Sequence, residues 1–316
     1  MKGLYFSDGT LSLRADLPEP EPRPDEALIK VVKAGICRTD LEIVRGYMGF
    51  TGVPGHEFVG IVEKPEGHAL SGRRVVGEIN CGCGHCSFCQ DGMKNHCPGR
   101  TVLGIQGKDG AFAERLCLPL ENLLPVPDGV SDEEAVFVEP VAAACRITEQ
   151  LDVRGKKVLV LGDGKLGLLI AQVLSLSEGR VTLCGKHPEK LALLEGTEVS
   201  TARLSDLEPG ELHDVVVDAT GRPEGLPLAL AHARPRGQLV LKTTAARPPD
   251  IDHNQLVINE ITIVGSRCGP FGEGLRLLGT GKLRLAPLVH KTFPLDEGLE
   301  AFAEAAEPGA LKVLIG

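Results

Sequence analysis

Five short apolar runs, spaced by segments of helical length, fill much of the second half of the chain, and the first run ends in a glycine-rich turn. The runs contain few polar residues, which is typical of parallel strands buried on both faces by helices. A helical pattern at 166–176 follows the first turn directly. This arrangement predicts a doubly wound α/β domain with a parallel sheet over residues 141–269. The expected strands are 156–162, 180–185, 214–221, 237–244 and 261–266.

The first 140 residues have a different texture. Short β-like runs, for example at 27–32 and 58–63, alternate with glycine and proline, which predicts an irregular, mostly β unit over 1–140. The segment 270–316 contains one helical stretch and a last strand at 312–315, and it is too short to be a domain of its own. We therefore expect it to return to the first unit.

Composition argues against several classes of partner. The net charge is −9 and no basic stripe is present, so a nucleic acid is not expected to bind. No run of about 18 apolar residues occurs that would span a membrane. The first ten residues also lack the apolar core of a signal peptide. We expect a cytoplasmic protein that binds neither nucleic acids nor membranes.

Residues 162–167 read Gly-Asp-Gly-Lys-Leu-Gly, a G-x-G-x-x-G pattern between an apolar strand and a helix. In this context Gly162 permits the tight turn, Gly164 lets the backbone approach a pyrophosphate, and Gly167 lets the helix lie close to the sheet. The N–H groups at the start of the helix can bind phosphates. The pattern predicts a dinucleotide site, with a plain glycine-rich turn as the alternative. Further residues expected there are Lys165, Leu166 and Thr220.

The end of the second strand bears on the choice of dinucleotide. Where NAD is preferred, a carboxylate there accepts hydrogen bonds from the ribose hydroxyls. This strand ends in Gly185 instead, which leaves room, and cations that can pair with a 2′-phosphate follow it: Lys186, His187 and Lys190. The sequence therefore favours NADP over NAD. Glu189 keeps NAD open, and the cations can alternatively be part of an ordinary surface loop.

Ten cysteines are present, and five of them lie within residues 81–97. In a reducing cytoplasm such crowding indicates metal binding rather than disulfides. The spacing C-x2-C-x2-C-x7-C fits a closed, tetrahedral and therefore structural zinc site. Its expected ligands are Cys83, Cys86, Cys89 and Cys97. Cys81 lies just outside the pattern, and the scattered cysteines other than Cys37 are expected to be small buried hydrophobes.

A second set of metal-binding residue types is dispersed along the chain. Cys37 lies in GICRTD, His56 and Glu57 follow Gly55, and Glu139 precedes Pro140. Taken singly, these have ordinary interpretations: a buried cysteine, a loop histidine and surface glutamates. Their separation in sequence does not by itself bring them together.

The motifs occur in the order GICRTD, GHEFVGIV, the four-cysteine loop, DGAFAE, VEP and VLVLGDGKLG. This order resembles that of the zinc-containing medium-chain dehydrogenases along essentially the whole chain. The resemblance implies a GroES-like catalytic domain interrupted by a Rossmann domain. It also implies a zinc-dependent, NAD(P)-linked dehydrogenase that oxidises an alcohol, polyol or sugar hydroxyl to a carbonyl. Family members pair through the edge of the Rossmann sheet, here 261–266, which implies a homodimer or homotetramer.

The same resemblance implies a catalytic zinc site separate from the structural one. Cys37 and His56 match its first two ligands. Glu139 matches the third ligand of the branch that contains sorbitol and threonine dehydrogenases, and Glu57 matches a conditional fourth ligand. Asp40 matches the acid that orients the ligand histidine, a role that metal-bound histidines commonly require.

Three further residues on this stretch receive roles from the resemblance. Thr39 matches the hydroxyl that takes the substrate proton, and Arg38 stands where some members have an arginine that binds the pyrophosphate. Many members have a histidine that passes the proton to solvent where this chain has Glu42, as in the archaeal glucose dehydrogenase branch. Glu42 can accept a proton or bind sugar hydroxyls, or it can be a solvated residue at the rim.

Two other functions stay open at this point. The first is a zinc-free enone or quinone reductase on the same scaffold, but such relatives lack the Cys37, His56 and Glu139 set. The second is a non-catalytic protein that binds zinc or NADPH. A second metal site open to solvent would count against it.

Overall fold

The computed structural model describes residues 1–244 and 247–316. Its chain forms two compact units. The first unit comprises Met1–Glu139, Leu278–Gly281 and Leu285–Gly316, and the second comprises Pro140–Leu277 and Lys282–Arg284. The second unit is therefore an insertion between segments of the first.

The second unit is built on a parallel sheet of six strands in the order β13-β12-β11-β14-β15-β16. This order, with the first strand of the unit in the middle, is that of a doubly wound dinucleotide-binding fold. Ligands of such sheets bind beyond the carboxyl ends of the strands, where the strand order reverses. The strands are β11 (Lys157–Leu161), β12 (Arg180–Gly185), β13 (Ser200–Arg203), β14 (His213–Asp218), β15 (Ala233–Leu241) and β16 (Thr262–Gly265).

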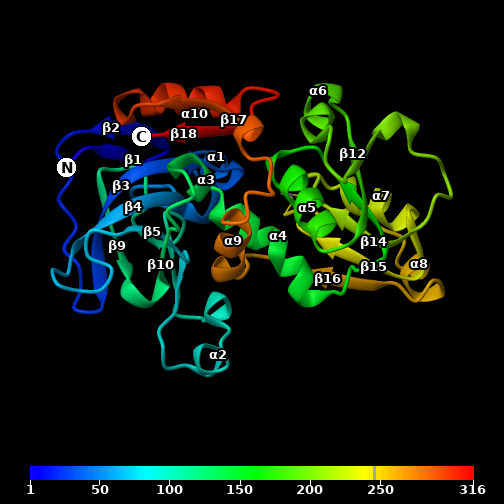
Figure 1. Cartoon of the computed structure of the whole chain (residues 1–316), viewed down its shortest axis with the longest axis horizontal. Coiled ribbons are helices and arrows are strands. Elements are labelled where there is room, and N and C mark those ends of the chain that lie inside the picture. Colours follow the sequence, from blue (N-terminus) through cyan, green and yellow to red (C-terminus); the bar gives the residue numbers. More distant parts are fainter. Residues whose placement is uncertain (245–246) are drawn as a thin grey trace. The chain divides into compact units, whose positions relative to one another are not determined.

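Helices cover this sheet, as Figure 1 shows for α5 and α7. Helix α5 packs on β11 and β12, and α7 packs on β14 and β15. The face of α5 that meets the sheet is apolar and fully buried, as expected for a helix that follows a buried parallel strand. The helices of the unit are α4 (Val138–Gln150), α5 (Lys165–Leu176), α6 (Pro188–Leu191), α7 (Gly225–Ala231), α8 (His253–Ile258) and α9 (Phe271–Leu278).

Helix α9 packs on α4 of the second unit. The sequence predicted that the chain returns to the first unit at residue 270, whereas residues up to Leu277 belong to the second unit. The reason is a close approach of backbones. A Cβ atom on Gly269 would lie 1.7 Å from the carbonyl oxygen of Ala142 in α4, and one on Gly274 would lie 3.0 Å from its nitrogen. Because neither glycine has a side chain, α9 packs directly on α4.

The first unit centres on a mostly antiparallel sheet in the order β10-β5-β4-β3-β18-β17, with β9 also paired to β3. Strand β18 pairs antiparallel with β3 and parallel with β17. Helix α10 packs on β17 and β18. The strands of this sheet are β3 (Glu26–Ile36), β4 (Glu57–Lys64), β5 (Arg74–Gly77), β9 (Arg115–Pro119), β10 (Leu123–Pro125), β17 (Val289–Phe293) and β18 (Lys312–Ile315).

Smaller elements complete the first unit. The strands are β1 (Gly3–Ser7), β2 (Thr10–Arg14), β6 (Asn80–Cys81), β7 (Thr101–Leu103) and β8 (Gly107–Lys108). The helices are α1 (Arg38–Ile43), α2 (Ser87–Gln90), α3 (Asp132–Ala135) and α10 (Gly298–Ala306). The 3-10 turns of the chain are Tyr47–Gly49, Lys94–His96, Leu120–Asn122, Ala192–Leu194, Leu204–Asp206, Ala286–Leu288 and Leu295–Glu297. In the part of the chain that the structure describes, no helix has the length and apolar character to cross a bilayer.

Candidate functional site

The first cluster of functional side chains lies at one edge of the sheet in the first unit. Gly35 near the end of β3 pairs with Glu57 at the start of β4, and β18 lies on the other side of β3. Cys37 directly follows β3, and His56 directly precedes β4. The metal-binding atoms of Cys37, His56 and Glu57 accordingly lie within 4.8 Å of one another. The sheet register thus joins residues that the sequence keeps 20 positions apart.

Asp40 in α1 holds two members of this cluster. Its Oδ2 accepts a hydrogen bond of 2.8 Å from the backbone N–H of Cys37, and its Oδ1 lies 3.1 Å from Nδ1 of His56. Asp40 is fully buried and His56 is 3% exposed, so neither group exchanges this contact for water. With Nδ1 facing Asp40, the other ring nitrogen of His56 is left for a metal, as in metal-bound histidines generally.

The electrostatics of the cluster favour an added cation. Burial opposes the charged form of His56, but Asp40 and Cys37 outweigh it, and together they raise the histidine pKa well above its usual range. Burial raises the pKa of Glu139 to about 7, and the neighbouring carboxylates Glu57 and Glu78 add to the rise, while His56 lowers it. A thiol and several carboxyl groups crowded in this way are stabilised by a bound Zn²⁺. The donor set therefore fits zinc.

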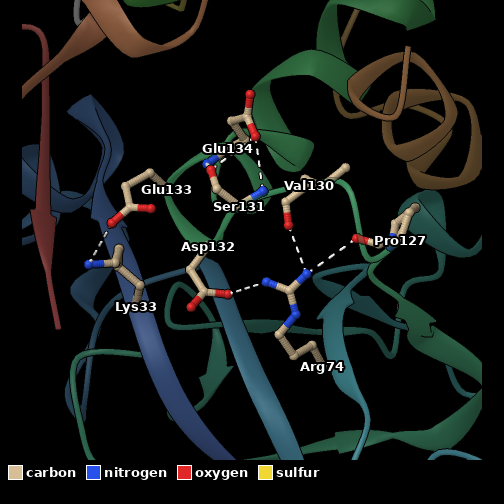
Figure 2. A network of polar contacts seen from close by, with 8 residues as sticks. All are labelled: Lys33, Arg74, Pro127, Val130, Ser131, Asp132, Glu133 and Glu134. Carbon is tan, nitrogen blue, oxygen red and sulfur yellow. Dashed lines mark hydrogen bonds and ion pairs between the residues drawn. The ribbon is translucent and has the colours of Figure 1, made fainter. Parts of the chain in front are cut away.

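A network of polar contacts surrounds α3, a few residues before Glu139 in the sequence (Figure 2). Arg74 of β5 donates hydrogen bonds to the carboxylate of Asp132, at 2.6 Å, and to the carbonyl of Val130, at 2.7 Å. Lys33 of β3 forms an ion pair of 3.1 Å with Glu133. These contacts fix α3 on the sheet, and the first turn of α4 with Glu139 follows it in sequence. Glu139 lies outside the group of three ligand atoms given above, although its charge interacts with that of His56.

Lys312, the first residue of β18, forms a buried ion pair with Glu57 in which both side chains are 1% exposed. Its ammonium group also lies 5.6 Å from the centre of the Phe137 ring. A Cβ atom on Gly35 would lie 2.8 Å from a carboxylate oxygen of Glu57 and 3.1 Å from Cδ of Lys312. The glycine therefore provides the space for this pair. Sequence reasoning missed Lys312, whose one available signal was a charge at the start of an apolar strand.

The remaining predicted residues of α1 lie at its surface. The hydroxyl of Thr39 is 3.8 Å from the Cys37 sulfur, beside the ligand cluster. Glu42 forms ion pairs with Arg38, at 2.8 Å, and with Arg45, at 3.0 Å, and its side chain is 38% exposed. These contacts fit the predicted alternative of a rim residue, whereas neither the proton-relay role of Glu42 nor the pyrophosphate role of Arg38 is tested by them.

The four cysteines of the crowded loop come together in a second cluster. The ligand atoms of Cys83, Cys86, Cys89 and Cys97 lie within 4.8 Å of one another. The backbone N–H of Cys83 donates to the Cys97 sulfur at 3.4 Å. Backbone hydrogen bonds from the loop lower the pKa of Cys83 to about 6, which favours the thiolate that zinc binds. Burial raises the pKa of the neighbouring Cys81 to about 11, so that this thiol stays protonated.

The second unit carries the predicted dinucleotide turn at the carboxyl end of β11. Gly162 has a positive φ of 113°, and Gly164 is the residue that caps α5. A Cβ atom on Gly167 would lie 1.8 Å from the carbonyl oxygen of Gly162, so that only glycine fits there. Thr220 follows β14 at the same end of the sheet, with its Cα 3.1 Å from a Cβ built on Gly162. The geometry is that of a Rossmann phosphate-binding turn.

Asp163, inside this turn, is a residue that sequence reasoning passed over. Its Oδ2 accepts hydrogen bonds of 2.7 Å from the backbone N–H groups of both Lys186 and His187. Its carboxylate also lies 3.0 Å from Nδ1 of His187. Three of the cofactor residues predicted at the end of β12, namely Gly185, Lys186 and His187, thus adjoin a carboxylate. Among the residues that the structure describes, no such contact is given for the fourth, Lys190. The signal available in the sequence was an acidic residue, Asp163, inside the G-x-G-x-x-G motif.

Comparisons with known proteins identify the family of the chain. Residues 23–128 match the model of the alcohol dehydrogenase GroES-like domain. L-threonine 3-dehydrogenase of Streptomyces avermitilis is 32% identical, over 95% of this chain and 94% of that protein. A crystal structure of an alcohol dehydrogenase from E. coli CFT073 with NADH has a TM-score of 0.91 at 29% identity, covering 100% of this chain and 98% of that one. A zinc-binding dehydrogenase from Sinorhizobium meliloti 1021 with NADP has a TM-score of 0.90 at 28% identity, covering 99% and 98%.

The chain therefore belongs to the zinc-containing medium-chain dehydrogenase/reductase family. The predicted fold, a Rossmann sheet inserted in a GroES-like, mostly β unit, is confirmed. The protein is an oxidoreductase that acts on CH–OH groups and uses zinc and a nicotinamide dinucleotide. Of the two solved structures named above, one contains NADH and the other NADP, so these comparisons leave the choice between the two cofactors open.

Proposed function

We propose that Cys37, His56 and Glu139 hold the catalytic zinc, with Glu57 as an exchangeable fourth ligand, and that this centre oxidises the hydroxyl of a small alcohol, polyol or sugar. The observation that carries the proposal is the convergence of Cys37, His56 and Glu57 in front of a fully buried Asp40. A carboxylate that orients a ligand histidine is typical of metal sites with histidine ligands, and a structural site of four cysteines has no such histidine. A catalytic zinc site also keeps one coordination position open, which a structural site does not.

Some residues of the first unit would orient the zinc ligands, and others would transfer the substrate proton. When bound, zinc polarises the substrate oxygen and the nicotinamide accepts the hydride. Asp40 keeps His56 in one orientation and one tautomer, so that the site does not reorganise during turnover. Thr39 lies beside the Cys37 sulfur, where its hydroxyl can take the proton of the substrate hydroxyl. Glu42 would carry that proton to solvent.

Two carboxylates compete for the place of third ligand. Glu57 is the carboxylate whose ligand atom lies within 4.8 Å of those of Cys37 and His56, but it is engaged by Lys312. Glu139 interacts electrostatically with both His56 and Glu57, and burial raises the pKa of its carboxyl group, so a bound cation would stabilise its ionised form. We therefore assign Glu139 as the permanent ligand and Glu57 as the exchangeable one.

The other finer predictions concern the cofactor, the structural zinc and the assembly. Cys83, Cys86, Cys89 and Cys97 would hold the structural zinc. The preference for NADP and the cytoplasmic location stay predictions from the sequence, and the contacts of Asp163 argue against NADP. A homodimer or homotetramer would form at the free side of β16. Three apolar side chains there support this: Val257 and Ile258, which are 73% and 78% exposed, and Ile263.

The metal assignment is tested by zinc content and turnover together. Wild-type protein should contain two zinc ions per chain and oxidise a member of a panel of polyols, aldoses, threonine and simple alcohols. Cys37→Ser should retain one zinc ion and lose turnover by about a hundredfold or more, because the metal supplies several kcal/mol of charge stabilisation. Cys145→Ser is the matched control, since Cys145 is buried in the second unit, belongs to neither cluster of metal-binding residues, and should change neither value.

Glu139→Ala separates the two carboxylates. If Glu139 is the permanent ligand, this variant should lose the same zinc ion as Cys37→Ser, whereas Glu57→Gln should keep it. Two zinc ions and full turnover in Glu139→Ala would overturn the assignment.

A further inference from the structure

The carboxyl end of β12 holds an acidic group that does not come from β12. A Cβ atom built on Gly185 would lie 2.4 Å from Oδ2, 2.5 Å from Cβ and 2.6 Å from Cγ of Asp163. The carboxyl group of Asp163 therefore fills the space that a side chain at residue 185 would occupy. Gly185 is buried, and it is needed there because the side chain of the neighbouring turn has taken its place.

Asp163 is fixed in this position and kept ionised. Its Oδ2 accepts two backbone hydrogen bonds of 2.7 Å, from Lys186 and His187, and Nδ1 of His187 lies 3.1 Å from Oδ1. Burial opposes the ionised form, but these hydrogen bonds and the charge of His187 outweigh it and lower the pKa of the carboxyl group. The end of β12 thus carries a negative charge near neutral pH.

We propose that Asp163 is the residue that selects the dinucleotide, and that it makes this protein prefer NAD(H) to NADP(H). In a Rossmann fold the acid at the end of the second strand accepts hydrogen bonds from the ribose hydroxyls and repels a 2′-phosphate. Here the acid comes from the glycine-rich turn of the first strand and reaches the same place. The inference rests on the proposed use of a nicotinamide dinucleotide and deepens it.

The same contacts remove the basis for the NADP preference predicted from the sequence. That prediction relied on space at Gly185 and on nearby cations, but Asp163 fills the space. The N–H groups of Lys186 and His187, which would otherwise be available to a 2′-phosphate, already donate to Asp163. The ring of His187 faces the same carboxylate. A 2′-phosphate would meet a carboxylate whose neighbouring donors are engaged, which is unfavourable.

Binding measurements test the inference without relying on turnover. We would titrate the zinc-loaded protein with NADH and with NADPH, following nucleotide fluorescence, and displace NADH with 5′-AMP and with 2′,5′-ADP. Wild-type protein should bind NADH at least about tenfold more tightly than NADPH, because the 2′-phosphate of NADPH would meet a like charge at the binding site. Displacement should follow the same order, with 5′-AMP the better competitor.

Asp163→Asn removes the charge and keeps the shape and the hydrogen-bond acceptor. It should lower the ratio of NADH to NADPH affinity by about tenfold or more. Asp163→Ala combined with Gly185→Asp moves the acid back to β12 and should restore the ratio, which a merely structural role of Asp163 would not allow. Asp214→Asn is the control. Asp214 also accepts a backbone hydrogen bond of 2.7 Å, from Lys157, but at the opposite end of the sheet, so the ratio should stay that of the wild type.

Each outcome decides the matter. Tighter binding of NADPH by the wild type, or an unchanged ratio in a folded Asp163→Asn variant, would overturn the inference, and so would the absence of any dinucleotide binding. If NADH is preferred and the preference depends on Asp163, the inference stands even where no alcohol of the panel is oxidised. The absence of alcohol oxidation would then count against the proposed reaction and not against the role of Asp163.

Discussion

Replacing Lys312 by methionine should leave Glu57 as a buried carboxylate without its ion-pair partner. Both side chains are 1% exposed, so water cannot take over the role of the ammonium group. Breaking one side of such a pair typically costs about 3–5 kcal/mol. We expect Lys312→Met to lower the free energy of unfolding of the first unit by that amount. Methionine keeps the length and apolar character of the lysine side chain, so packing against Phe137 should change little.

Tyrosine fluorescence in a urea titration gives a suitable assay. The chain has no tryptophan, and both of its tyrosines, Tyr5 and Tyr47, lie in the first unit, so the signal reports the unfolding of that unit. Lys2→Met is the control, because the ion pair of Lys2 with Asp296 is exposed and its loss should leave the midpoint unchanged within error.

A double variant isolates the pair itself. Lys312→Met with Glu57→Gln removes both charges and should recover much of the lost stability, since two neutral groups of similar shape replace a broken pair. A loss below about 1 kcal/mol in Lys312→Met, the usual value for an exposed pair, would refute the reasoning that the pair is buried and dry. Additivity of the two single substitutions would refute the coupling.

Three further outcomes are expected. Burial is the main cause that lowers the pKa of His213, so the unfolded state binds the proton more tightly and stability should fall as the pH drops below about 6.5. Between pH 7.5 and pH 5.5, the melting temperature of His213→Leu should therefore fall less than that of the wild type. An equal fall in both proteins would contradict this cause. Cys97→Ser should remove one zinc ion per chain and lower the melting temperature, as elemental analysis and calorimetry would show; unchanged zinc content would rule out the structural site. Gly167→Ala places a methyl group 1.8 Å from the Gly162 carbonyl oxygen; NADH affinity should fall by about tenfold or more, and wild-type affinity would mean that the turn does not bind the pyrophosphate.

The sequence predicts the order of the fold well because the constraints on it are local. The apolar runs at 156–162 and 214–221 form β11 and β14. The glycines at 162 and 167 occupy positions where the surrounding backbone leaves no room for a side chain. The four-cysteine loop is equally local, since its ligands lie within 15 residues of one another. Such patterns can be read without knowledge of what packs against them.

The missed residues depend on contacts that a linear pattern does not contain. Lys312 reaches Glu57 across 255 positions because β18 pairs with β3, and Asp163 reaches the end of β12 across 23 positions because β11 and β12 are neighbours. From the sequence, Gly185 suggested free space for a 2′-phosphate. In the structure the carboxyl group of Asp163 fills that space. The sequence alone likewise does not distinguish Glu139 from Glu57 as the third zinc ligand, because that choice depends on how close two segments far apart in sequence come to each other.

The position of β18 has a consequence for the order in which the two units fold during synthesis. A ribosome emits β3, with the Cys37 and His56 that border it, long before it emits β18, and the whole second unit lies between them. The inserted unit can therefore fold while its host still lacks an inner strand, with one edge of β3 exposed to wrong partners. During that interval Glu57 has no lysine beside it. A nascent chain stalled before residue 312 should accordingly display a protease-resistant core from the inserted unit and a host that is still cleaved.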